Sequence, residues 1–192
     1  EDAGPIANPE VDKPTEDDFI RGNPSATFAI VEYSDFDCPY CETFHNTAIE
    51  FIEKYGDEAM WVYRHLPLEM HPNAEEKAIA SECAGLQGGD ESFWSYSDQL
   101  FIRIEESASS QEELKTLLVS IASDVGLNIT EFTSCYENKE TLDNIQEDMQ
   151  SAETAQVSGT PGNFILNLET GDTIPLRGAV PIDVLENALE AF

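Results

Sequence analysis

The chain has 192 residues, with 39 acidic and 9 basic side chains and a formal net charge of −30. A surface this negative repels nucleic-acid phosphates and anionic lipid headgroups, so we predict neither nucleic-acid binding nor docking on a membrane surface. Hydrophobic residues make up 41% of the chain and aromatic residues 9%. These values are typical of globular proteins and not of disordered chains. We therefore expect a folded protein with a substantial core and most of its acidic residues on the surface.

The N-terminal stretch, residues 1–24, contains four prolines and seven acidic residues. We interpret it as a loosely packed lead-in, which either spaces the protein from a removed signal or upstream anchor or is a simple terminal tail. Its first residues have no signal-peptide pattern and look like a mature or truncated terminus. The longest apolar run, residues 59–63, is far too short to span a bilayer.

Residues 25–71 are predicted to form a β-α-β unit. Thr27–Tyr33 has apolar residues on both faces, which is typical of a central strand covered on both sides. Pro39–Tyr55 has apolar residues at helical spacing and is followed by Gly56, a common residue at a helix end. Ala59–Leu66 is predicted as a second strand, parallel to the first because a helix connects the two.

The following segment, residues 72–156, is predicted to be entirely helical. The expected helices cover residues 73–87, 91–105, 110–125, 130–137 and 140–155. The last segment, residues 157–192, returns to strands at Asn163–Leu168 and Thr173–Arg177, which a turn joins into a hairpin. A final helix is predicted over Ile182–Phe192, after Pro181.

A pair of cysteines, in the motif Cys38-Pro39-Tyr40-Cys41, lies where the first strand passes into the first helix. With Cys38 as the N-cap residue, the N–H of Cys41 is expected to point at the Cys38 sulfur, and the positive helix end favours its thiolate. The pKa of Cys38 should therefore fall, while Cys41 lies on the buried helix face. This arrangement predicts an exposed attacking sulfur and a protected resolving sulfur. The alternative is a structural disulfide or a chance spacing.

Four acidic residues lie close to this motif. Asp35, Asp37 and Glu42 flank it, and their charges should oppose thiolate formation unless they merely stabilise the helix N-terminus. Glu32 shares a strand face with apolar residues, so we predict a buried carboxyl group with a raised pKa that exchanges a proton with Cys41. The alternative for Glu32 is an acid at the strand end that reaches solvent.

The remaining cysteines, Cys83 and Cys135, lie far apart on the apolar faces of two predicted helices. A structural zinc site usually needs two closely spaced pairs of ligands, and only one such pair exists here. The three histidines show no ligand spacing with each other. We therefore predict no metal and no cofactor.

Four motifs resemble the DsbA-like branch of the thioredoxin-fold oxidoreductases. In chain order they are residues 18–24 (Asp-Phe-Ile-Arg-Gly-Asn-Pro), 31–41 (Val-Glu-Tyr-Ser-Asp-Phe-Asp-Cys-Pro-Tyr-Cys), 63–67 (Tyr-Arg-His-Leu-Pro) and 157–161 (Val-Ser-Gly-Thr-Pro). The resemblance covers about residues 17–192. It implies an α/β protein with a thioredoxin fold, β-α-β … β-β-α, and an all-helical domain inserted between the two halves.

The resemblance also implies roles for particular residues. Thr160-Pro161 should be a cis peptide facing the Cys38 sulfur, with the Thr160 backbone pairing with a bound substrate strand, and Glu32 stands where the family keeps a buried acid. Some members have a second disulfide in the inserted domain, so a Cys83–Cys135 bond is predicted; the alternative is two buried free thiols. The chain departs from the family at Gly162-Asn163 and in having Pro-Tyr rather than Pro-His between the cysteines.

The expected function is that of a monomeric dithiol oxidase that introduces disulfides into reduced or unfolded exported proteins through Cys38 and Cys41. The resemblance implies a quinone-linked membrane partner as reoxidant, and a location in the periplasm or at the cell surface, with or without a tether. The alternatives are a disulfide reductase or isomerase with the same site, and a non-catalytic binding module that uses the groove beside Pro161. Because acidic residues are spread over the whole chain and lysine is scarce, we also expect adaptation to a salty medium.

Overall fold

The structure is a computed structural model that describes residues 10–106, 108 and 110–192. The first nine residues of the predicted lead-in lie outside the described residues. A single five-stranded sheet has the order β1-β3-β2-β4-β5, and only its β2–β3 pair is parallel. The strands are β1 (Phe19–Gly22), β2 (Phe28–Ser34), β3 (Ala59–His65), β4 (Gly162–Asn167) and β5 (Thr173–Arg177).

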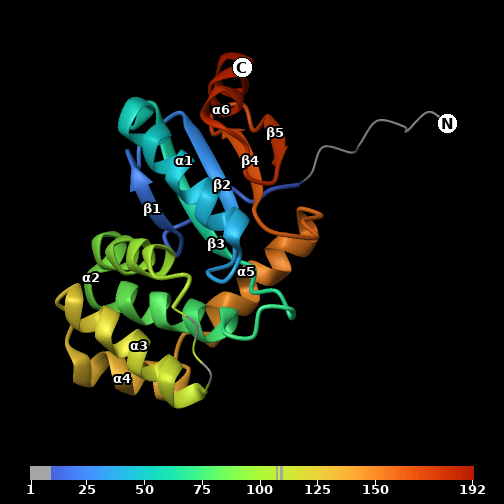
Figure 1. Cartoon of the computed structure of the whole chain (residues 1–192). Coiled ribbons are helices and arrows are strands. Elements are labelled where there is room, and N and C mark those ends of the chain that lie inside the picture. Colours follow the sequence, from blue (N-terminus) through green and yellow to red (C-terminus); the bar gives the residue numbers. More distant parts are fainter. Residues whose placement is uncertain (1–9, 107, 109) are drawn as a thin grey trace.

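Helices cover both faces of this sheet (Figure 1). On one face, α1 packs on β3 and α6 packs on β4, while on the other face α5 packs on β3. Because side chains alternate along a strand, neighbouring residues of β2 enter different cores: Ile30 faces α1, and Val31 faces Ala152 of α5. The helices are α1 (Pro39–Tyr55), α2 (Ala74–Ile102), α3 (Gln111–Asp124), α4 (Ile129–Asn138), α5 (Leu142–Thr154) and α6 (Ile182–Glu190).

This architecture confirms the predicted thioredoxin fold with a helical insertion. Helices α2, α3 and α4 form a lobe below the sheet (Figure 1). In the sequence, this lobe is inserted between the β-α-β half and the β-β-α half of the fold. The helices predicted over residues 73–87 and 91–105 lie end to end in α2, separated by a kink at Gly88 and Gly89 where the backbone is not helical. Gly89 has a φ of +62°, a conformation that glycine adopts without steric cost. In the described part of the chain, no helix is both long enough and apolar enough to cross a membrane.

The sequence prediction missed strand β1. We expected residues 1–24 to form a loose lead-in, but Phe19–Gly22 pairs antiparallel with β3 along the edge of the sheet. The ring of Phe19 stacks on Phe93 of α2, with 4.1 Å between ring centroids, and the N–H of Ile20 donates to Asp90. A four-residue strand is too short for a clear alternating pattern, and its partners are remote in the sequence. The lead-in interpretation is therefore wrong for these residues.

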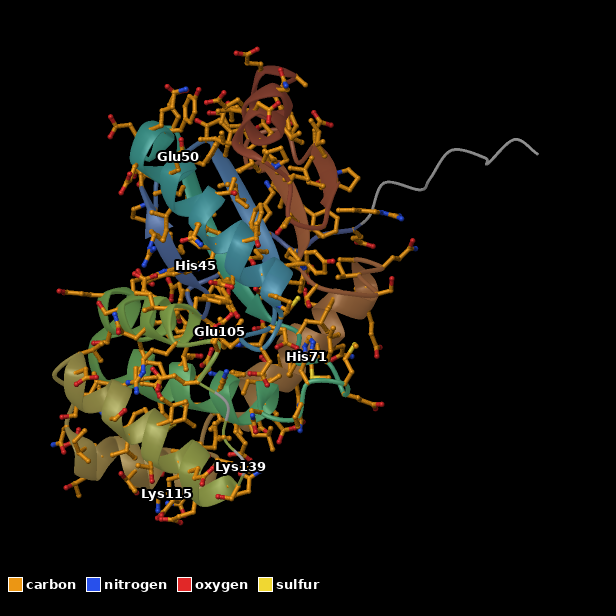
Figure 2. All side chains as sticks on the ribbon, in the orientation of Figure 1. His45, Glu50, His71, Glu105, Lys115 and Lys139 are labelled. Carbon is orange, nitrogen blue, oxygen red and sulfur yellow. A yellow bond between two sulfur atoms is a disulfide. The ribbon has the colours of Figure 1, made fainter. Side chains whose placement is uncertain are left out.

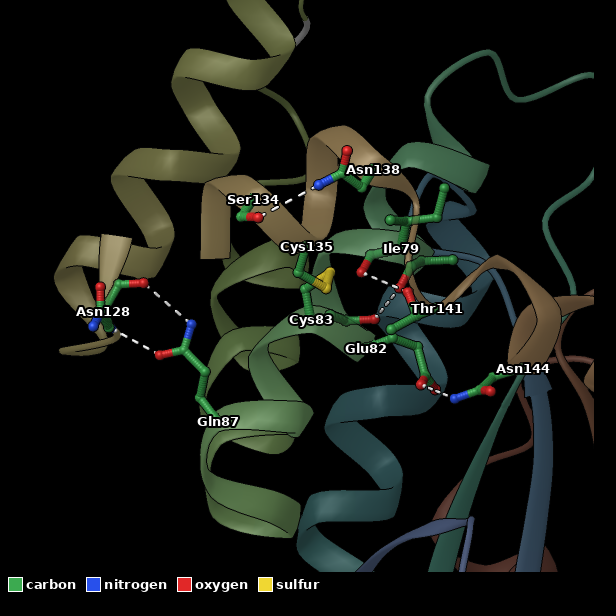
Figure 3. Close-up of a disulfide and its surroundings, with 12 residues drawn as sticks. Ile79, Glu82, Cys83, Gln87, Asn128, Ser134, Cys135, Asn138, Thr141 and Asn144 are labelled. Carbon is green, nitrogen blue, oxygen red and sulfur yellow. Dashed lines mark hydrogen bonds between the residues drawn. A yellow bond between two sulfur atoms is a disulfide. The ribbon is translucent and has the colours of Figure 1, made fainter. Parts of the chain in front are cut away.

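A disulfide bond joins Cys83 of α2 to Cys135 of α4 (Figure 3). The two Cα atoms are 5.9 Å apart, and the cysteines are separated by 52 positions in the chain. Further along the same two helices, the amide of Gln87 exchanges two hydrogen bonds with the backbone of Asn128. The disulfide and the two Gln87–Asn128 hydrogen bonds hold α4 against α2. They add to the apolar contacts in the core of the lobe.

Candidate active site

The two remaining cysteines lie at the N-terminus of α1, where the chain leaves the central strand β2. Cys38 is the N-cap residue with an extended backbone, and Pro39 is the first helical residue, where its missing N–H leaves no hydrogen bond unmade. Both cysteines are free thiols. The exposed fraction is 4% for Cys38 and 0% for Cys41, so the resolving position is protected and the attacking position reaches the surface only slightly.

The sulfur of Cys38 faces the loop that leads into β4. Its thiol donates a hydrogen bond of 3.5 Å to the carbonyl oxygen of Thr160, and the Thr160–Pro161 peptide is cis. The N–H of Cys41 donates a hydrogen bond of 3.0 Å to the Cys38 carbonyl oxygen rather than the capping bond to the sulfur that we predicted, but the N–H groups of Cys41 and Tyr40 still lower the pKa of the Cys38 thiol.

The pKa of Cys38 is nevertheless lowered to about 5. Hydrogen bonding from the Cys41 thiol is the largest lowering influence, and Thr160 and the backbone N–H groups of Cys41 and Tyr40 add to it, while burial acts in the opposite direction. The pKa of Cys41 is raised instead, first by burial, then by its hydrogen bond to Cys38 and by the nearby charge of Glu32. The two thiols therefore differ strongly in acidity, as dithiol exchange requires.

Glu32 lies in the core beneath the cysteines, with an exposed fraction of 0%. One carboxyl oxygen accepts a hydrogen bond of 2.6 Å from the Ser34 hydroxyl, and the other accepts one of 3.0 Å from the indole N–H of Trp61. Burial raises the pKa of Glu32 to about 8, against the lowering effect of these two hydrogen bonds. The alternative of an acid that reaches solvent is thus excluded.

The carboxylates of Asp35 and Asp37 are bound by other parts of the chain. Asp35 accepts hydrogen bonds from the N–H groups of Asp37 and Leu68 and contacts the ring of His71 at 2.8 Å (His71 is labelled in Figure 2). Asp37 pairs with the buried Lys77 of α2. These partners offset the repulsion of the thiolate that we predicted for the two aspartates, which instead hold the loop after β3 and the start of α2 against the site.

Sequence reasoning missed Ser34, Trp61 and Lys77. Ser34 could have been found, because it is two residues after Glu32 and therefore on the same face of β2. Trp61 and Lys77 gave no local signal, since their contacts with the site depend on strand register and on the packing of α2. Tyr40, between the cysteines, is 67% exposed and is available to a partner molecule.

Two of the histidines, His45 and His65, are buried in the core. His45 is buried where α1 faces α2 (Figure 2), and its Nε2 atom contacts Asp98 at 2.8 Å. His65 ends β3 and lies 3.3 Å from Glu82. Among the residues that the structure describes, no three histidine, cysteine or acidic side chains are grouped so that they could hold a metal ion.

Comparisons with known proteins agree with this geometry. A family model described as thioredoxin matches residues 14–173. DsbA2 of Pseudomonas aeruginosa is 26% identical, with a TM-score of 0.74 over 93% of this chain and 96% of that one. BdbD of Bacillus subtilis, at 17% identity, has a TM-score of 0.78 over 96% of this chain and 98% of that one, and supports the fold alone.

The curated relatives are much longer proteins. A Na⁺/H⁺ antiporter NhaA of Mycolicibacterium gilvum is 32% identical over 153 residues, which are 78% of this chain and 23% of that protein. The antiporter NhaA of Herminiimonas arsenicoxydans is 32% identical over 186 residues, 97% of this chain and 27% of that protein. This chain therefore spans about a quarter of the length of these curated relatives.

A dithiol at a helix N-terminus, beside a cis-proline in a thioredoxin fold, defines the class of thiol-disulfide oxidoreductases. The chain belongs to the thioredoxin family, and within it to the DsbA-like branch.

Proposed function

We propose that this chain is a dithiol oxidase that transfers a disulfide from Cys38 and Cys41 to reduced, exported proteins. The observation that carries the proposal is the opposite displacement of the two thiol pKa values, down to about 5 for Cys38 and upward for Cys41. A reduced form with a stabilised thiolate makes a dithiol more oxidising, because the stabilisation must be given up when the disulfide re-forms.

The reaction begins with the oxidised protein, in which Cys38 and Cys41 form a disulfide. A substrate thiolate attacks the Cys38 sulfur, and Cys41 leaves with the electron pair of the broken bond. The second substrate thiolate then attacks the substrate sulfur of the mixed disulfide and releases Cys38 as a thiolate. The substrate is thereby oxidised to a disulfide and the protein is reduced to a dithiol.

Substrate binding is proposed at the loop of Thr160 and Pro161. The carbonyl of Thr160 lies within hydrogen-bonding distance of the Cys38 sulfur, so an extended substrate segment paired with the Thr160 backbone would bring its own sulfur to the same place. The ring of Tyr40, two residues after Cys38 in the chain, is exposed and could contact a bound substrate. Recognition mainly through backbone groups would suit unfolded substrates of varied sequence.

Two chemical features, the structural disulfide and the need for an oxidant, support our proposals for the location of the protein and for its redox partner. The Cys83–Cys135 disulfide is of a kind that persists in oxidising compartments, which supports a location in the periplasm or at the cell surface. Repeated turnover needs an oxidant for the reduced pair, and a quinone-linked membrane protein is proposed for this role. We propose that the chain acts as a monomer, either free or tethered through a segment that precedes it.

The test is to equilibrate the protein with glutathione buffers and to follow oxidation of a reduced substrate protein. We expect a potential above about −200 mV and net formation of substrate disulfides, whereas a potential below about −250 mV would overturn the oxidase in favour of a reductase. A Cys41→Ser variant should accumulate the mixed disulfide through Cys38, and Cys38→Ser should not. Alkylation of Cys38 with the pH dependence of an unperturbed thiol would favour a binding module with inert cysteines.

A further inference from the structure

Ser34 is the last residue of β2 and is buried between the two ionisable groups of the resolving half-site. Its exposed fraction is 1%, and its hydroxyl contacts Glu32 at 2.6 Å. The Ser34 hydroxyl also acts on Cys41, because it lowers the pKa of that thiol as a group able to donate to the thiolate does. Glu32 and Cys41 are themselves fully buried, so Ser34 is a polar link between a carboxyl group and a sulfur that are both shielded from solvent.

The chemistry of Cys41 demands a proton at this place. When a substrate attacks Cys38, Cys41 leaves as a thiolate in a buried position where a charge is strongly disfavoured. When the pair is reoxidised, Cys41 must lose its proton before it can attack the mixed disulfide on Cys38. Both steps need a group that exchanges a proton with Cys41 without exposing it to water.

We propose that the Ser34 hydroxyl relays the proton between the Glu32 carboxyl group and the Cys41 sulfur. This inference rests on the proposed function. In the reducing half-reaction Ser34 donates its proton to the Cys41 thiolate and takes the proton of the Glu32 carboxylic acid, which leaves a Cys41 thiol and a Glu32 carboxylate. In reoxidation the same transfers run in reverse, and no electrons move in either step.

The surroundings of Ser34 favour this relay. The indole N–H of Trp61 holds the second carboxyl oxygen of Glu32 at 3.0 Å, so the first oxygen stays aimed at Ser34. A hydroxyl group has one hydrogen and two acceptor positions, and can therefore accept from Glu32 while it donates to Cys41, or the reverse. The other ionisable groups that act on this cluster are Cys38, Tyr63 and Asp35.

The test measures the Cys41 step separately from the Cys38 step. Reduced protein is mixed with oxidised glutathione, samples are quenched with acid, and mass spectrometry follows formation and decay of the glutathione adduct on Cys38. For Ser34→Ala we expect decay of the adduct at neutral pH to slow by about a hundredfold, the lower end of the range for losing general acid–base assistance. Its pH profile should also move to higher pH, whereas formation of the adduct and the thiolate absorbance of Cys38 stay within about twofold of the original protein.

Two further variants make the result specific. Ser34→Thr keeps the hydroxyl and should restore most of the decay rate. Ser81→Ala removes another buried hydroxyl, which donates to Ala78 within α2, and should leave both steps unchanged. In a Glu32→Gln background, Ser34→Ala should cause little additional slowing, because the two residues act in one transfer.

The inference is overturned if Ser34→Ala decays at the original rate with the original pH profile, or if Ser34→Thr is as slow as Ser34→Ala. If Ser34→Ala does not fold, the solvent deuterium isotope effect on the unmodified protein decides: about twofold or more on adduct decay and near one on adduct formation is expected, and near one on both overturns the relay. If the unmodified protein forms no adduct at all, the proposed function itself fails, which is a different result.

Discussion

The indole nitrogen of Trp61 donates a hydrogen bond of 3.0 Å to the buried carboxyl group of Glu32, across the parallel pair of strands at the centre of the sheet. With the Ser34 hydroxyl on its other oxygen, Glu32 has a hydrogen-bonding partner on each side, yet burial still raises its pKa to about 8. A core that keeps such an acid loses stability wherever the acid is charged, which suggests that Glu32 is retained for its chemistry.

Replacing Glu32 by glutamine should stabilise the protein in a pH-dependent way. The folded state holds the Glu32 proton up to about pH 8 and the unfolded state releases it near pH 4.5, so the original protein loses stability as pH rises between these values. We expect Glu32→Gln to change the free energy of unfolding little at about pH 5 and to raise it by roughly 2–4 kcal/mol at about pH 9. Urea unfolding of the reduced protein at both pH values measures this, and an equal effect at the two would contradict the assignment.

Titration of Cys38 should show a midpoint near pH 5. Because its pKa is lowered in the folded state, the thiolate stabilises the reduced protein above the unfolded-state pKa near 9, and this contribution falls progressively and is lost as pH drops through about 5. We therefore expect the reduced form to melt at a higher temperature than the oxidised form at neutral pH, with the gap closing toward pH 4. Thiolate absorbance and melting curves of both forms test this, and a gap that does not depend on pH would speak against it.

Breaking the pair between Lys77 and Asp37 should affect both stability and the site. Both side chains are largely buried, so Lys77→Met leaves a carboxylate without its counter-charge next to Cys38. We expect a loss of roughly 3 kcal/mol in the free energy of unfolding and an increase in the pKa of Cys38.

The double variant Lys77→Met/Asp37→Asn should recover most of both effects. Lys115→Met serves as a control, because Lys115 makes a more exposed pair with Glu137 on the helical lobe (Figure 2), worth less than about 1 kcal/mol. If the single variant leaves the Cys38 titration unchanged, the link between this pair and the thiolate is wrong.

Loss of the Cys83–Cys135 disulfide should destabilise the helical lobe without abolishing activity. A loop closed over a separation of 52 residues corresponds to about 4 kcal/mol in the chain-entropy treatment. We expect Cys83→Ala/Cys135→Ala to unfold at a clearly lower urea concentration while the Cys38 titration stays the same. A loss below about 1 kcal/mol would mean that the hydrogen bonds around Gln87 and Asn128 and the apolar core hold the lobe without the bond (Figure 3).

Adaptation to a salty medium predicts that stability rises with ionic strength. With 39 acidic and 9 basic side chains, repulsion within the surface should weaken as salt shortens the screening length from about 10 Å at 0.1 M to about 3 Å at 1 M. We expect the melting temperature to rise over this range of NaCl. A non-ionic osmolyte at matched osmolality is the control, and an equal rise with it, or no rise with NaCl, would count against the hypothesis.

Much of the fold could be predicted from local patterns. The strand and helix around Cys38 were predicted almost to the residue, because Thr27–Tyr33 is a short run with apolar residues on both faces, Pro39–Tyr55 has helical periodicity, and Gly56 follows the helix. The edge strand Phe19–Gly22 was missed, because four residues carry no distinct period and its pairing with β3 is a long-range event. The break between the two predicted helices does appear, as the kink at Gly88 and Gly89, because these glycines take backbone conformations that are not helical.

By itself, the sequence determined the order of the elements from β2 onward, the place of the dithiol at a strand-to-helix junction, and the place of Cys41 on the buried face of its helix. These depend on hydrophobic periodicity and on helix-capping preferences, which act within a few residues. Only the tertiary structure decided what each polar group contacts: Trp61 and Ser34 at Glu32, Lys77 at Asp37, His71 at Asp35, and the Thr160 carbonyl at Cys38. Those contacts follow from strand register and from the way the inserted helices close on the sheet, and they set the charge balance around the thiolate that no local pattern contains.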